Sequence, residues 1–530
     1  MSIAATAERA RHRAPGTRRV PRAARAAGVA LLTALLFLAY LRQSRQVPVR
    51  SDGGSIALQA WDMLHGNLLL HGWTMSDVSF WSTELVQYTL LEAVHGLGPG
   101  VIHLGGAMTY TLLLVLAAWL ARGRATGREG LARAGLAAVV MLAPAPAASP
   151  TLLLTPDHLG SAVPVLLAWL AAERRPARRA PWAGAAMVAL LLAWGQVADG
   201  LIVITGVVPM VIACGARAAV AWRHRARGGS AGQDLLLVAA ALASAGLARA
   251  AEAVIRVSGG FVLKPVATQF AGLPVLPQHV KLTAEGLLVL FGVGVPVPHS
   301  AVGLALAALH LALAAAAAVA FIVALSRLGR GAEPAVPALA LAIVFNVAAY
   351  VPTTYVQNLL SAREIAAVLP FGAVLAGRVL GGPAVRARLA PVLAAATLAC
   401  AVALGYHAAR PAVPAANQPL ASWLAARHLT AGLSADYWVA NSTTLDAGGR
   451  ITVRQVSLSH GTLVRPLSWG YRAGWYDPAA HRAVFLVGTD TTRRDWRGAA
   501  VRAFGPPALV LRPPGYTVLV WHKNLLADIR

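Results

Sequence analysis

Long apolar runs separated by short polar segments dominate the sequence. Three of these runs, at 26–41, 103–121 and 301–325, are near or at the roughly 17–25 residues that a membrane-spanning helix needs. Applied to the whole chain, this length rule predicts about eleven spans. They are expected at 26–41, 101–121, 131–149, 159–172, 182–198, 200–222, 234–254, 301–326, 336–354, 362–380 and 389–407. The pattern is typical of a polytopic α-helical membrane protein, with residues 26–408 as its transmembrane domain.

Two of the segments between predicted spans are long. In the first, 42–100, apolar residues recur at helical spacing in "IALQAWDMLHG" and "WSTELVQYTLLEAVHGL". The first stripe contains Ile56, Ala60, Met63 and Leu64, and the second contains Leu85, Tyr88, Leu91 and Leu97. Such amphipathic helices are expected to lie flat in the membrane interface, where Trp and Tyr are favoured. In the second long segment, 255–300, glycine and proline exclude a regular span.

The pattern changes after about residue 408. Alternation of apolar and polar residues in "RITVRQVSL", "AVFLVGT" and "YTVLVWH" predicts strands. The stretch "PLASWLAARHLTAG" predicts an amphipathic helix, with Gly432 as its C-cap. We therefore expect residues 409–530 to form a small α/β domain that packs against the membrane part.

Composition supports lipid as the main surroundings of the chain. Hydrophobic residues make up 57% of the sequence, mean hydropathy is +0.61, and only 13% of residues are charged. Soluble domains carry roughly 25% charged residues. The net charge of +25 first suggests nucleic acid, but the arginines form short clusters between apolar runs, with Trp222 as the one aromatic residue among them. A nucleic-acid groove needs basic residues interleaved with aromatics, so nucleic acid is excluded as a partner.

Charge also predicts the orientation in the membrane. The Arg-rich segment 1–25 is expected to be a disordered cytosolic tail, followed by an uncleaved signal-anchor because "LRQSRQVPVRSD" offers no small-x-small cleavage site. With this end inside, the arginine clusters fall in cytosolic loops. The acids that fall outside are Asp52, Asp62, Asp77, Glu84, Asp157 and Asp199. Residues 409–530 are then extracytoplasmic, and the bias toward alanine and arginine is typical of a GC-rich bacterium, so we expect a bacterial plasma membrane.

Two outside acids are candidates for chemistry. Asp52 follows the first span closely, so the amphipathic helices after it could roof it over and make it a general base. Otherwise it is a solvated loop acid or the N-cap of a helix at 55–65. Asp157, in the short loop "LTPDHLGSAVP", either caps the next span or joins Asp52 in acid–base or metal chemistry. The adjacent His158 either binds a phosphate or acts as an acid, or is a structural interface residue.

Two other outside acids carry simpler expectations. Asp199 precedes a glycine, which is strong turn chemistry. Glu84 is expected on the solvated face of its helix.

Positive charge is scarce on the predicted outside. Lys264 falls in the second long segment, and Arg363 lies beside Glu364 at the start of a span. A basic residue at that depth costs free energy unless it is paired. Arg363 and Glu364 therefore either form a local pair or snorkel to headgroups, or Arg363 binds the phosphate of a lipid substrate.

These features resemble the membrane-embedded GT-C glycosyltransferases, which include polyprenyl-phosphate-sugar enzymes related to protein mannosyltransferases and to the aminoarabinose lipid A transferase. The resemblance covers the layout of most of the chain and is sharpest at "SDGGSIALQAWDMLHGNLLLHGW" and "TPDHLG". It implies that Asp52 is the base or the acid that positions the acceptor, and that Asp157 is a second acid. It also implies that Arg363 and Lys264 contact the lipid phosphate. Many relatives carry two adjacent acids in the first loop, whereas Gly53 follows Asp52 here, so a divalent cation on Asp52 and Asp157 stays open.

The resemblance implies an enzyme that transfers a sugar from a polyprenyl-phosphate donor to a cell-envelope glycan, lipid or protein. Neither GxxxxGK[ST] nor GxGxxG after a strand occurs, which excludes ATP-driven transport within this chain. One alternative is a lipid or solute transporter or flippase, which predicts ionisable residues at mid-span. The other is a catalytically silent scaffold with an outside binding domain, whose Trp469, Trp475 and Trp521 either stack on sugars or form its core.

Overall fold

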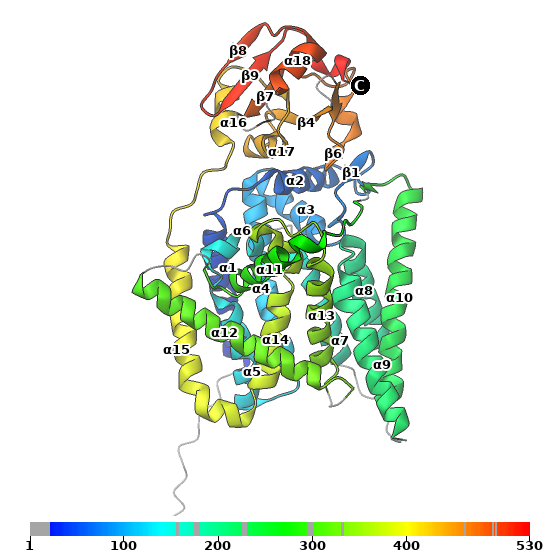
Figure 1. The fold of residues 1–530 in the computed structure, drawn as a ribbon, viewed down its shortest axis with the longest axis vertical. Helices are drawn as coiled ribbons and strands as arrows, with labels where there is room; N and C mark the ends of the chain where they lie inside the picture. The colour runs from blue at the N-terminus through cyan, green and yellow to red at the C-terminus, as the bar shows by residue number, and fades with distance from the viewer. Residues whose placement is uncertain are drawn as a thin grey trace, which may run out of the picture.

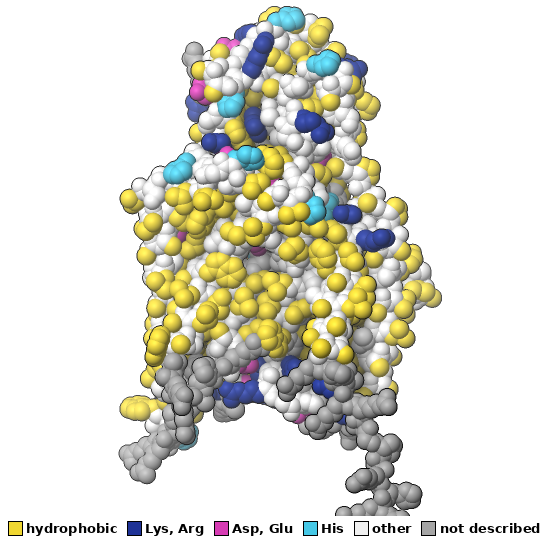
Figure 2. All heavy atoms as spheres, turned by 180° about the vertical axis from the view of Figure 1, so that it is seen from behind, with side chains coloured by type: hydrophobic (Ala, Val, Ile, Leu, Met, Phe, Trp, Pro, Cys, Tyr) yellow, Lys and Arg dark blue, Asp and Glu magenta, His cyan; other side chains and the backbone are white. Residues whose placement is uncertain are grey.

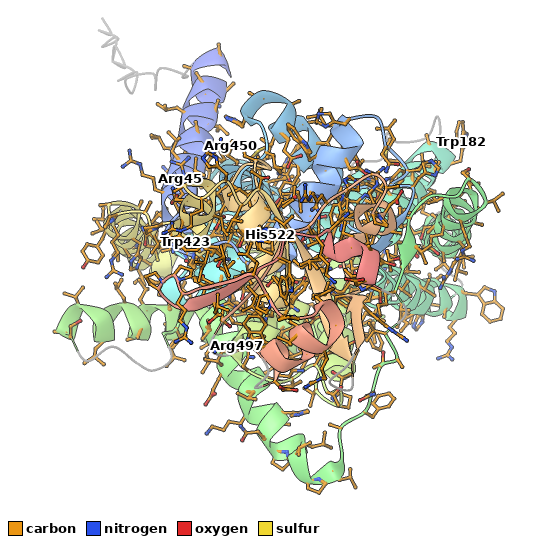
Figure 3. The ribbon with its side chains drawn as sticks, turned by 90° about the horizontal axis from the view of Figure 1, so that it is seen from above. Arg45, Trp182, Trp423, Arg450, Arg497 and His522 are labelled. Atoms are coloured by element: carbon orange, nitrogen blue, oxygen red, sulfur yellow. The ribbon has the colours of Figure 1, made fainter. Side chains whose placement is uncertain are left out.

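The computed structural model describes residues 22–154, 158–173, 181–224, 230–264, 266–294, 300–329, 333–459, 463–489, 492 and 495–529. A layer of long helices carries a smaller domain at one end (Figure 1). We call the side of this C-terminal domain the upper face and the opposite side the lower face. Seen from above, the C-terminal domain covers the middle of the helical layer, and Trp182 at the start of α8 lies far to its side (Figure 3).

Each predicted span overlaps a helix of the structure. The helices are α1 (Arg22–Ser44), α4 (Pro99–Arg122), α5 (Gly127–Leu142), α7 (Ala162–Glu173), α8 (Pro181–Ala198), α9 (Val208–Arg223), α10 (Ser230–Val257), α12 (Ala301–Ser326), α13 (Ala335–Tyr350), α14 (Val368–Leu380) and α15 (Pro383–Ala408). Within the described residues, six helices are long and apolar enough to cross a membrane, or up to eight if two bent pairs are each one span. The chain is thus a polytopic helical membrane protein as predicted, and the count of about eleven spans stays a prediction.

The surface of the helical layer is apolar where lipid would surround it. Figure 2 shows a broad belt of hydrophobic side chains over the helices, with Lys and Arg side chains below it at the lower end and above it on the C-terminal domain. On α12, for example, Leu304, Leu311 and Ile322 are exposed. In water such a belt would be an aggregation surface, whereas in a bilayer it is the surface that contacts lipid.

The centre of the helical layer is held by small residues and one buried ion cluster. Helix α14 is buried from Val368 to Arg378. At its lower end the Arg378 guanidinium binds Glu173 and lies 3.1 Å from Glu333, so the arginine is buried with two acidic partners. At its upper end α14 meets the 3₁₀ helix η5 (Leu359–Ile365) at a 61° bend. This bend brings η5 to the upper face, where the candidate site lies.

The two amphipathic helices expected in segment 42–100 are present. They are α2 (Ser51–Leu64) and α3 (Glu84–His95), which lie between the helical layer and the C-terminal domain (Figure 1). The predicted stripes point inward: Ile56, Ala60 and Met63 of α2 are buried, and so are Leu85 and Tyr88 of α3.

The expectation that Glu84 is solvated is wrong. Its side chain is 4% exposed and packs directly against Gly160. Burial raises the pKa of Glu84 to about 7. The contact joins residues that are far apart in sequence, so the helical pattern of α3 alone gave no sign of it.

The C-terminal domain is an α/β unit around a six-stranded sheet. Its strands are β3 (Ala431–Ser434), β4 (Thr452–Ser459), β5 (Leu463–Pro466), β7 (Phe485–Thr489), β8 (Leu509–Leu511) and β9 (Tyr516–Val520), in the order β5-β4-β3-β7-β9-β8. Strands β4, β3 and β7 are parallel, and the outer pairs are antiparallel. Its helices are α16 (Gln418–Ala425), α17 (Tyr437–Asp446) and α18 (Trp496–Phe504).

One detail of the C-terminal domain differs from the expectation. The predicted helix at 419–432 ends at Ala425, and Gly432 is part of β3 instead of a C-cap. A Cβ at Gly432 would lie 2.3 Å from the ring of Phe485, so glycine is needed there for the packing of the neighbouring strand.

A second, three-stranded sheet joins the domain to the membrane part. Strands β1 (Trp73–Met75), β2 (Val262–Leu263) and β6 (Tyr471–Arg472) pair in the order β2-β1-β6. They come from the first long segment, the second long segment and the C-terminal domain. Next to them Arg472 lies 2.9 Å from Asp62, and the Trp73 indole donates to the same carboxylate. The second long segment also contains α11 (Leu276–Leu290), a helix that the sequence analysis did not predict.

Candidate active site

Asp52 lies in the first turn of α2, directly below the C-terminal domain. The position before the helix is occupied by Arg50, whose backbone is extended, so Asp52 is not the N-cap. A carboxylate in the first turn is favoured by the positive end of the helix dipole. The side chain of Asp52 is 37% exposed, so it is accessible to a ligand.

The two glycines after Asp52 let α2 fit under the C-terminal domain. A Cβ at Gly54 would lie 2.9 Å from the carbonyl carbon of Asn441 in α17, closer than side chains pack. A Cβ at Gly53 would lie 3.0 Å from Val49. Glycine is therefore required for the close crossing of α2 and α17, and a second acid after Asp52 would have to displace its neighbours.

Two side chains from distant segments meet the Asp52 carboxylate. Arg363 in η5 places Nη1 3.6 Å from Oδ2. The Tyr437 hydroxyl, from the first residue of α17, donates a hydrogen bond to Oδ1. Burial, with the nearby Asp52 charge, raises the pKa of Tyr437 well above its usual value, so this phenol stays a donor.

The position of Arg363 is set by η5. Asn358 and Ser361 close the start of this helix with a reciprocal capping box. Arg363 also forms the predicted local pair, since its Nε lies 3.4 Å from Oε1 of Glu364. The local pair and the contact to Asp52 therefore coexist.

His158 lies between two carboxylates. Its Nδ1 is 2.8 Å from Oδ2 of Asp199, and its Nε2 is 2.9 Å from Oε2 of Glu364. An imidazole can donate from both nitrogens only when it is protonated. Burial alone would lower the pKa of His158, but Glu364 and Asp199 outweigh burial and hold the pKa well above its usual value. Asp199 also accepts from the backbone N–H of Leu201, so it has the expected turn role as well.

These contacts form one continuous chain of alternating charge. It runs from Asp199 through His158, Glu364 and Arg363 to Asp52, where the Tyr437 hydroxyl closes it. We call it the charge chain. Its six members come from the end of α8, the 3₁₀ helix η2 (His158–Ser161), η5, α2 and α17, so the charge chain ties the upper ends of several segments together.

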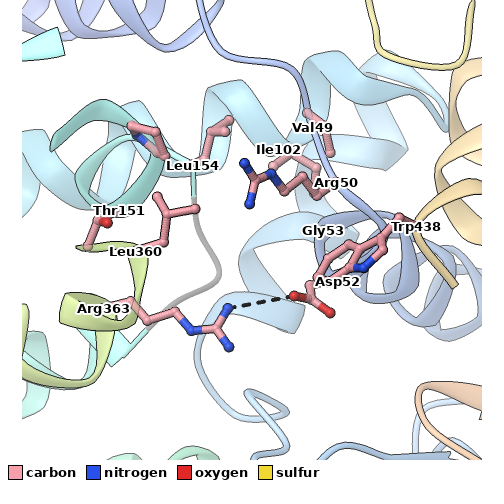
Figure 4. A pocket seen from close by; sticks show the side chains of 11 residues that line it. Val49, Arg50, Asp52, Gly53, Ile102, Thr151, Leu154, Leu360, Arg363 and Trp438 are labelled. Carbon is pink, nitrogen blue, oxygen red and sulfur yellow. Dashed lines mark ion pairs between the residues drawn. The ribbon is translucent and has the colours of Figure 1, made fainter. Parts of the chain in front are cut away.

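Two small cavities meet at the Asp52–Arg363 pair. The first, of about 80 Å³, is also lined by Arg50, Leu154, Leu360 and Trp438. Figure 4 shows the guanidinium groups of Arg50 and Arg363 directed into it from different sides. We call it the arginine cavity.

The second cavity, of about 150 Å³, lies on the other side of the pair. Its lining is more varied in chemistry and includes Asp77, His158, Tyr355, Glu364 and Trp469. We call it the mixed cavity. Because both cavities are lined by Asp52 and Arg363, a group bound in one is next to a group bound in the other.

Two larger apolar grooves open on the helical layer. One, of about 860 Å³, runs between α12 and α15 and reaches Ala145 and Pro146. The chain continues from there into α6 (Ser149–Leu152), which supplies Pro150 and Thr151 to the arginine cavity. The other, of about 800 Å³, lies among α1, α3, α4 and α7 and includes Glu84 and Gly160.

One predicted site residue, Lys264, is not part of this arrangement. Asp157 lies outside the described residues. Lys264 donates to the hydroxyl of Ser468, 2.9 Å away, and is not among the residues that line either small cavity. Within the described part of the chain, no group of three or more His, Cys, Asp or Glu side chains is arranged to hold a metal ion.

Three residues of the site, Arg50, Tyr437 and Trp438, were not predicted from the sequence. Arg50 stands two residues before Asp52 and carries positive charge on the predicted outside, a signal that was available. Tyr437 and Trp438 follow a strand and begin a helix, but nothing in the sequence connects them with Asp52, 385 residues away. The partnership of Asp199 with His158 was missed for the same reason.

No protein-family model matches the sequence, and no curated protein matches it. The structure is similar to that of ArnT from Cupriavidus metallidurans bound to undecaprenyl phosphate, with a TM-score of 0.54, 12% sequence identity, and coverage of 93% of this chain and 98% of that chain. It also matches apo ArnT (TM-score 0.44, 14% identity, 96% and 99% coverage). A third match is the archaeal oligosaccharyltransferase AglB from Archaeoglobus fulgidus in complex with an inhibitory peptide and a dolichol-phosphate (0.45, 13%, 90% and 72%). The similarity to undecaprenyl-phosphate-bound ArnT shows a common fold, so the predicted resemblance to GT-C glycosyltransferases is confirmed for the fold.

Proposed function

We propose that this chain, which has the fold of ArnT, is a membrane glycosyltransferase that moves a sugar from a polyprenyl-phosphate donor to an acceptor at its upper face. The observation that carries the proposal is the Asp52–Arg363 pair at the junction of two cavities. A carboxylate and a guanidinium at one point provide a base for an incoming hydroxyl and a cation for a departing phosphate.

The arginine cavity is the proposed site of the donor phosphate. Arg50 and Arg363 both face it, and among the described residues Asp52 is the one acid in its lining. Guanidinium groups bind two phosphate oxygens in a bidentate geometry. The apolar groove between α12 and α15 is the proposed site of the polyprenyl tail, and its lining residues Ala145 and Pro146 precede Pro150 and Thr151 of the arginine cavity in the sequence. ArnT was solved with undecaprenyl phosphate bound, which fits a ligand of this kind.

Asp52 is the proposed base. The acceptor hydroxyl attacks the anomeric carbon of the donor sugar and gives its proton to the Asp52 carboxylate. The bond between the anomeric carbon and the phosphate oxygen breaks, and its electron pair stays on the phosphate, beside Arg363 and Arg50. At 3.6 Å the Arg363–Asp52 contact is longer than a hydrogen bond, and both groups line the arginine cavity where the phosphate is proposed to bind.

The remaining members of the charge chain have a supporting role in this proposal. His158 and Glu364 hold Arg363 in place, and Tyr437 occupies one oxygen of Asp52. This orients the other oxygen toward the substrates. Asp157 is a further candidate acid, and with Asp52 a candidate ligand of a divalent cation. Arginines at the lower face support a cytosolic lower face and an extracytoplasmic site.

The test is transfer by membranes that contain the wild-type protein or an Asp52→Asn variant. Polyprenyl-phosphate-linked sugars with a radiolabelled sugar are added, and loss of label from the lipid fraction is measured. Removal of a general base is expected to lower the rate about 10²–10⁴-fold. The matched control is Asp495→Asn, because Asp495 is an exposed acid that pairs with Arg502 on the C-terminal domain. Equal rates for Asp52→Asn and wild type would remove Asp52 from the mechanism and refute the proposal.

A further inference from the structure

A third pocket lies beside the arginine cavity, between the C-terminal domain and residues 48–50. Its volume is about 480 Å³, within the roughly 300–1,000 Å³ typical of small-molecule sites. The residues that determine its chemistry are Arg50, Asn417, Asp436, Trp438, Thr489 and Tyr516. Val49, Arg50 and Trp438 line both this pocket and the arginine cavity, so the two spaces adjoin.

The topology of the sheet explains why a pocket forms here. Strand β3 lies between β4 and β7 and is parallel to both. After β3 the chain adds β4 on one side of it and later adds β7 on its other side. In α/β sheets, ligands bind at the carboxyl ends of strands where the order reverses in this way. Asp436 follows the carboxyl end of β3, and Thr489 is the last residue of β7. The pocket therefore occupies the position that this kind of sheet offers to a ligand.

The pocket combines an open aromatic face with hydrogen-bonding groups. The Trp438 side chain is 54% exposed. Around it lie the Asp436 carboxylate, the Thr489 hydroxyl and the hydroxyl of Tyr516, which donates to Asn417. Arg50 and Asp436 contribute one charge of each sign, so the pocket selects neither a strong anion nor a strong cation.

We infer that this pocket binds a neutral saccharide, the acceptor of the transfer reaction. A sugar ring has an apolar C–H face that covers an indole, and hydroxyls that both donate and accept hydrogen bonds around its edge. The pocket presents that combination above the apolar belt of the helical layer. The inference rests on the proposed function, because it names the acceptor class for the same site.

The position of Trp438 links this pocket to the reaction. Its neighbour Tyr437 donates to Asp52, and the two rings are in edge contact with centroids 5.1 Å apart. A saccharide that stacks on Trp438 therefore ends close to Asp52. Its terminal hydroxyl loses a proton to Asp52 as its oxygen bonds to the donor's anomeric carbon, and the phosphate leaves with the electron pair of the broken bond.

The experiment measures binding of the purified full-length protein to an array of bacterial oligosaccharides of two to eight hexopyranosyl or pentofuranosyl units. Wild type and Asp52→Asn are expected to retain the same oligosaccharides. Trp438→Ala should weaken binding at least tenfold, and Trp438→Phe should keep most of it because an aromatic face remains. Trp423→Ala is the matched control, since Trp423 lies in the same domain under Arg427 and outside the pocket. Elution by size exclusion as a single species shows that each variant is folded.

Three results would overturn the inference. The first is that no oligosaccharide binds to wild type, and the second is that Trp438→Ala binds as well as Trp423→Ala. The third is that Trp438→Ala weakens the binding of inorganic phosphate but not the binding of any oligosaccharide. That result would make the pocket an anion site. Oligosaccharide binding is measured without transfer, since Asp52→Asn is expected to bind without a general base. Failure of the proposed function would instead appear in the transfer assay, where wild type would release no sugar from the donor.

Discussion

Replacement of His158 by glutamine removes the cation that separates Asp199 from Glu364. The wild-type imidazole makes two short contacts, of 2.8 and 2.9 Å, and its side chain is 13% exposed. Loss of one partner of a buried ion pair costs roughly 3–5 kcal/mol, because the remaining charge stays buried without compensation. We expect His158→Gln to be destabilised by about this amount.

A double variant separates this electrostatic effect from a simple packing defect. In His158→Gln/Glu364→Gln, one of the two carboxylates that contact His158 is gone. The combined loss of stability should therefore be smaller than the sum of the single losses by about 1–3 kcal/mol. His279→Gln is the control: this buried histidine makes one contact, to the carbonyl of Val351 at 3.1 Å, and should show no coupling to Glu364.

The assay is thermal unfolding in detergent micelles over a range of pH. The pKa of His158 is raised in the folded protein, so its contribution to stability is complete below the unfolded pKa of about 6.5 and is lost as pH rises through the folded pKa. Wild type should lose stability on this alkaline side, and the loss should be smaller in His158→Gln because the contribution of His158 is absent. Additive losses in the double variant, or identical pH profiles for wild type and His158→Gln, would refute the charge chain as described.

The remaining predictions concern other parts of the structure. Tyr437→Phe removes the hydroxyl that donates to Asp52 and should lower transfer roughly tenfold and the free energy of unfolding by up to about 1.5–3 kcal/mol, the contribution of one hydrogen bond to a charged group; a rate equal to wild type would contradict this. Burial raises the pKa of Glu92 to about 9, so Glu92 should contribute a stability loss of up to about 1.4 kcal/mol per pH unit between pH ~4.5 and about 9, and Glu92→Gln should reduce the slope by that amount in unfolding measurements; parallel slopes would count against it. Gly54→Ala should lower the melting temperature and the transfer rate because its Cβ meets the α17 backbone, whereas Gly246→Ala in α10, with open space around its Cβ, should change neither; equal tolerance at both positions would show that the close crossing is not required.

Much of the membrane part was predictable because its signals are local. Every expected span overlaps a helix, since apolar length depends only on consecutive residues. The inward stripes of α2 and α3 were predictable for the same reason, as helical periodicity is visible within a dozen residues. Asp52, His158, Arg363 and Glu364 were identified one by one from their depth and charge, and the structure brings these four together.

What could not be predicted are the contacts between distant segments. Glu84 is buried because Gly160 leaves room for its carboxylate, and no property of α3 indicates this. Asp199 has the sequence of an ordinary turn and gains its second role only when η2 folds beside it. The contribution of Tyr437 depends on how the C-terminal domain sits on α2, which is a property of the assembled fold.

The small β2-β1-β6 sheet has a consequence for how this architecture can evolve. Its three strands belong to three stretches of chain, and its central strand hydrogen-bonds to both of the others. The C-terminal domain is thus attached to the two long loops of the membrane part through hydrogen-bonded strands, in addition to its covalent connection. A recombination event that moved residues 409–530 to another membrane scaffold would leave β6 without its partner strand and β1 with an unpaired edge. We therefore expect the domain and both loops to be inherited together.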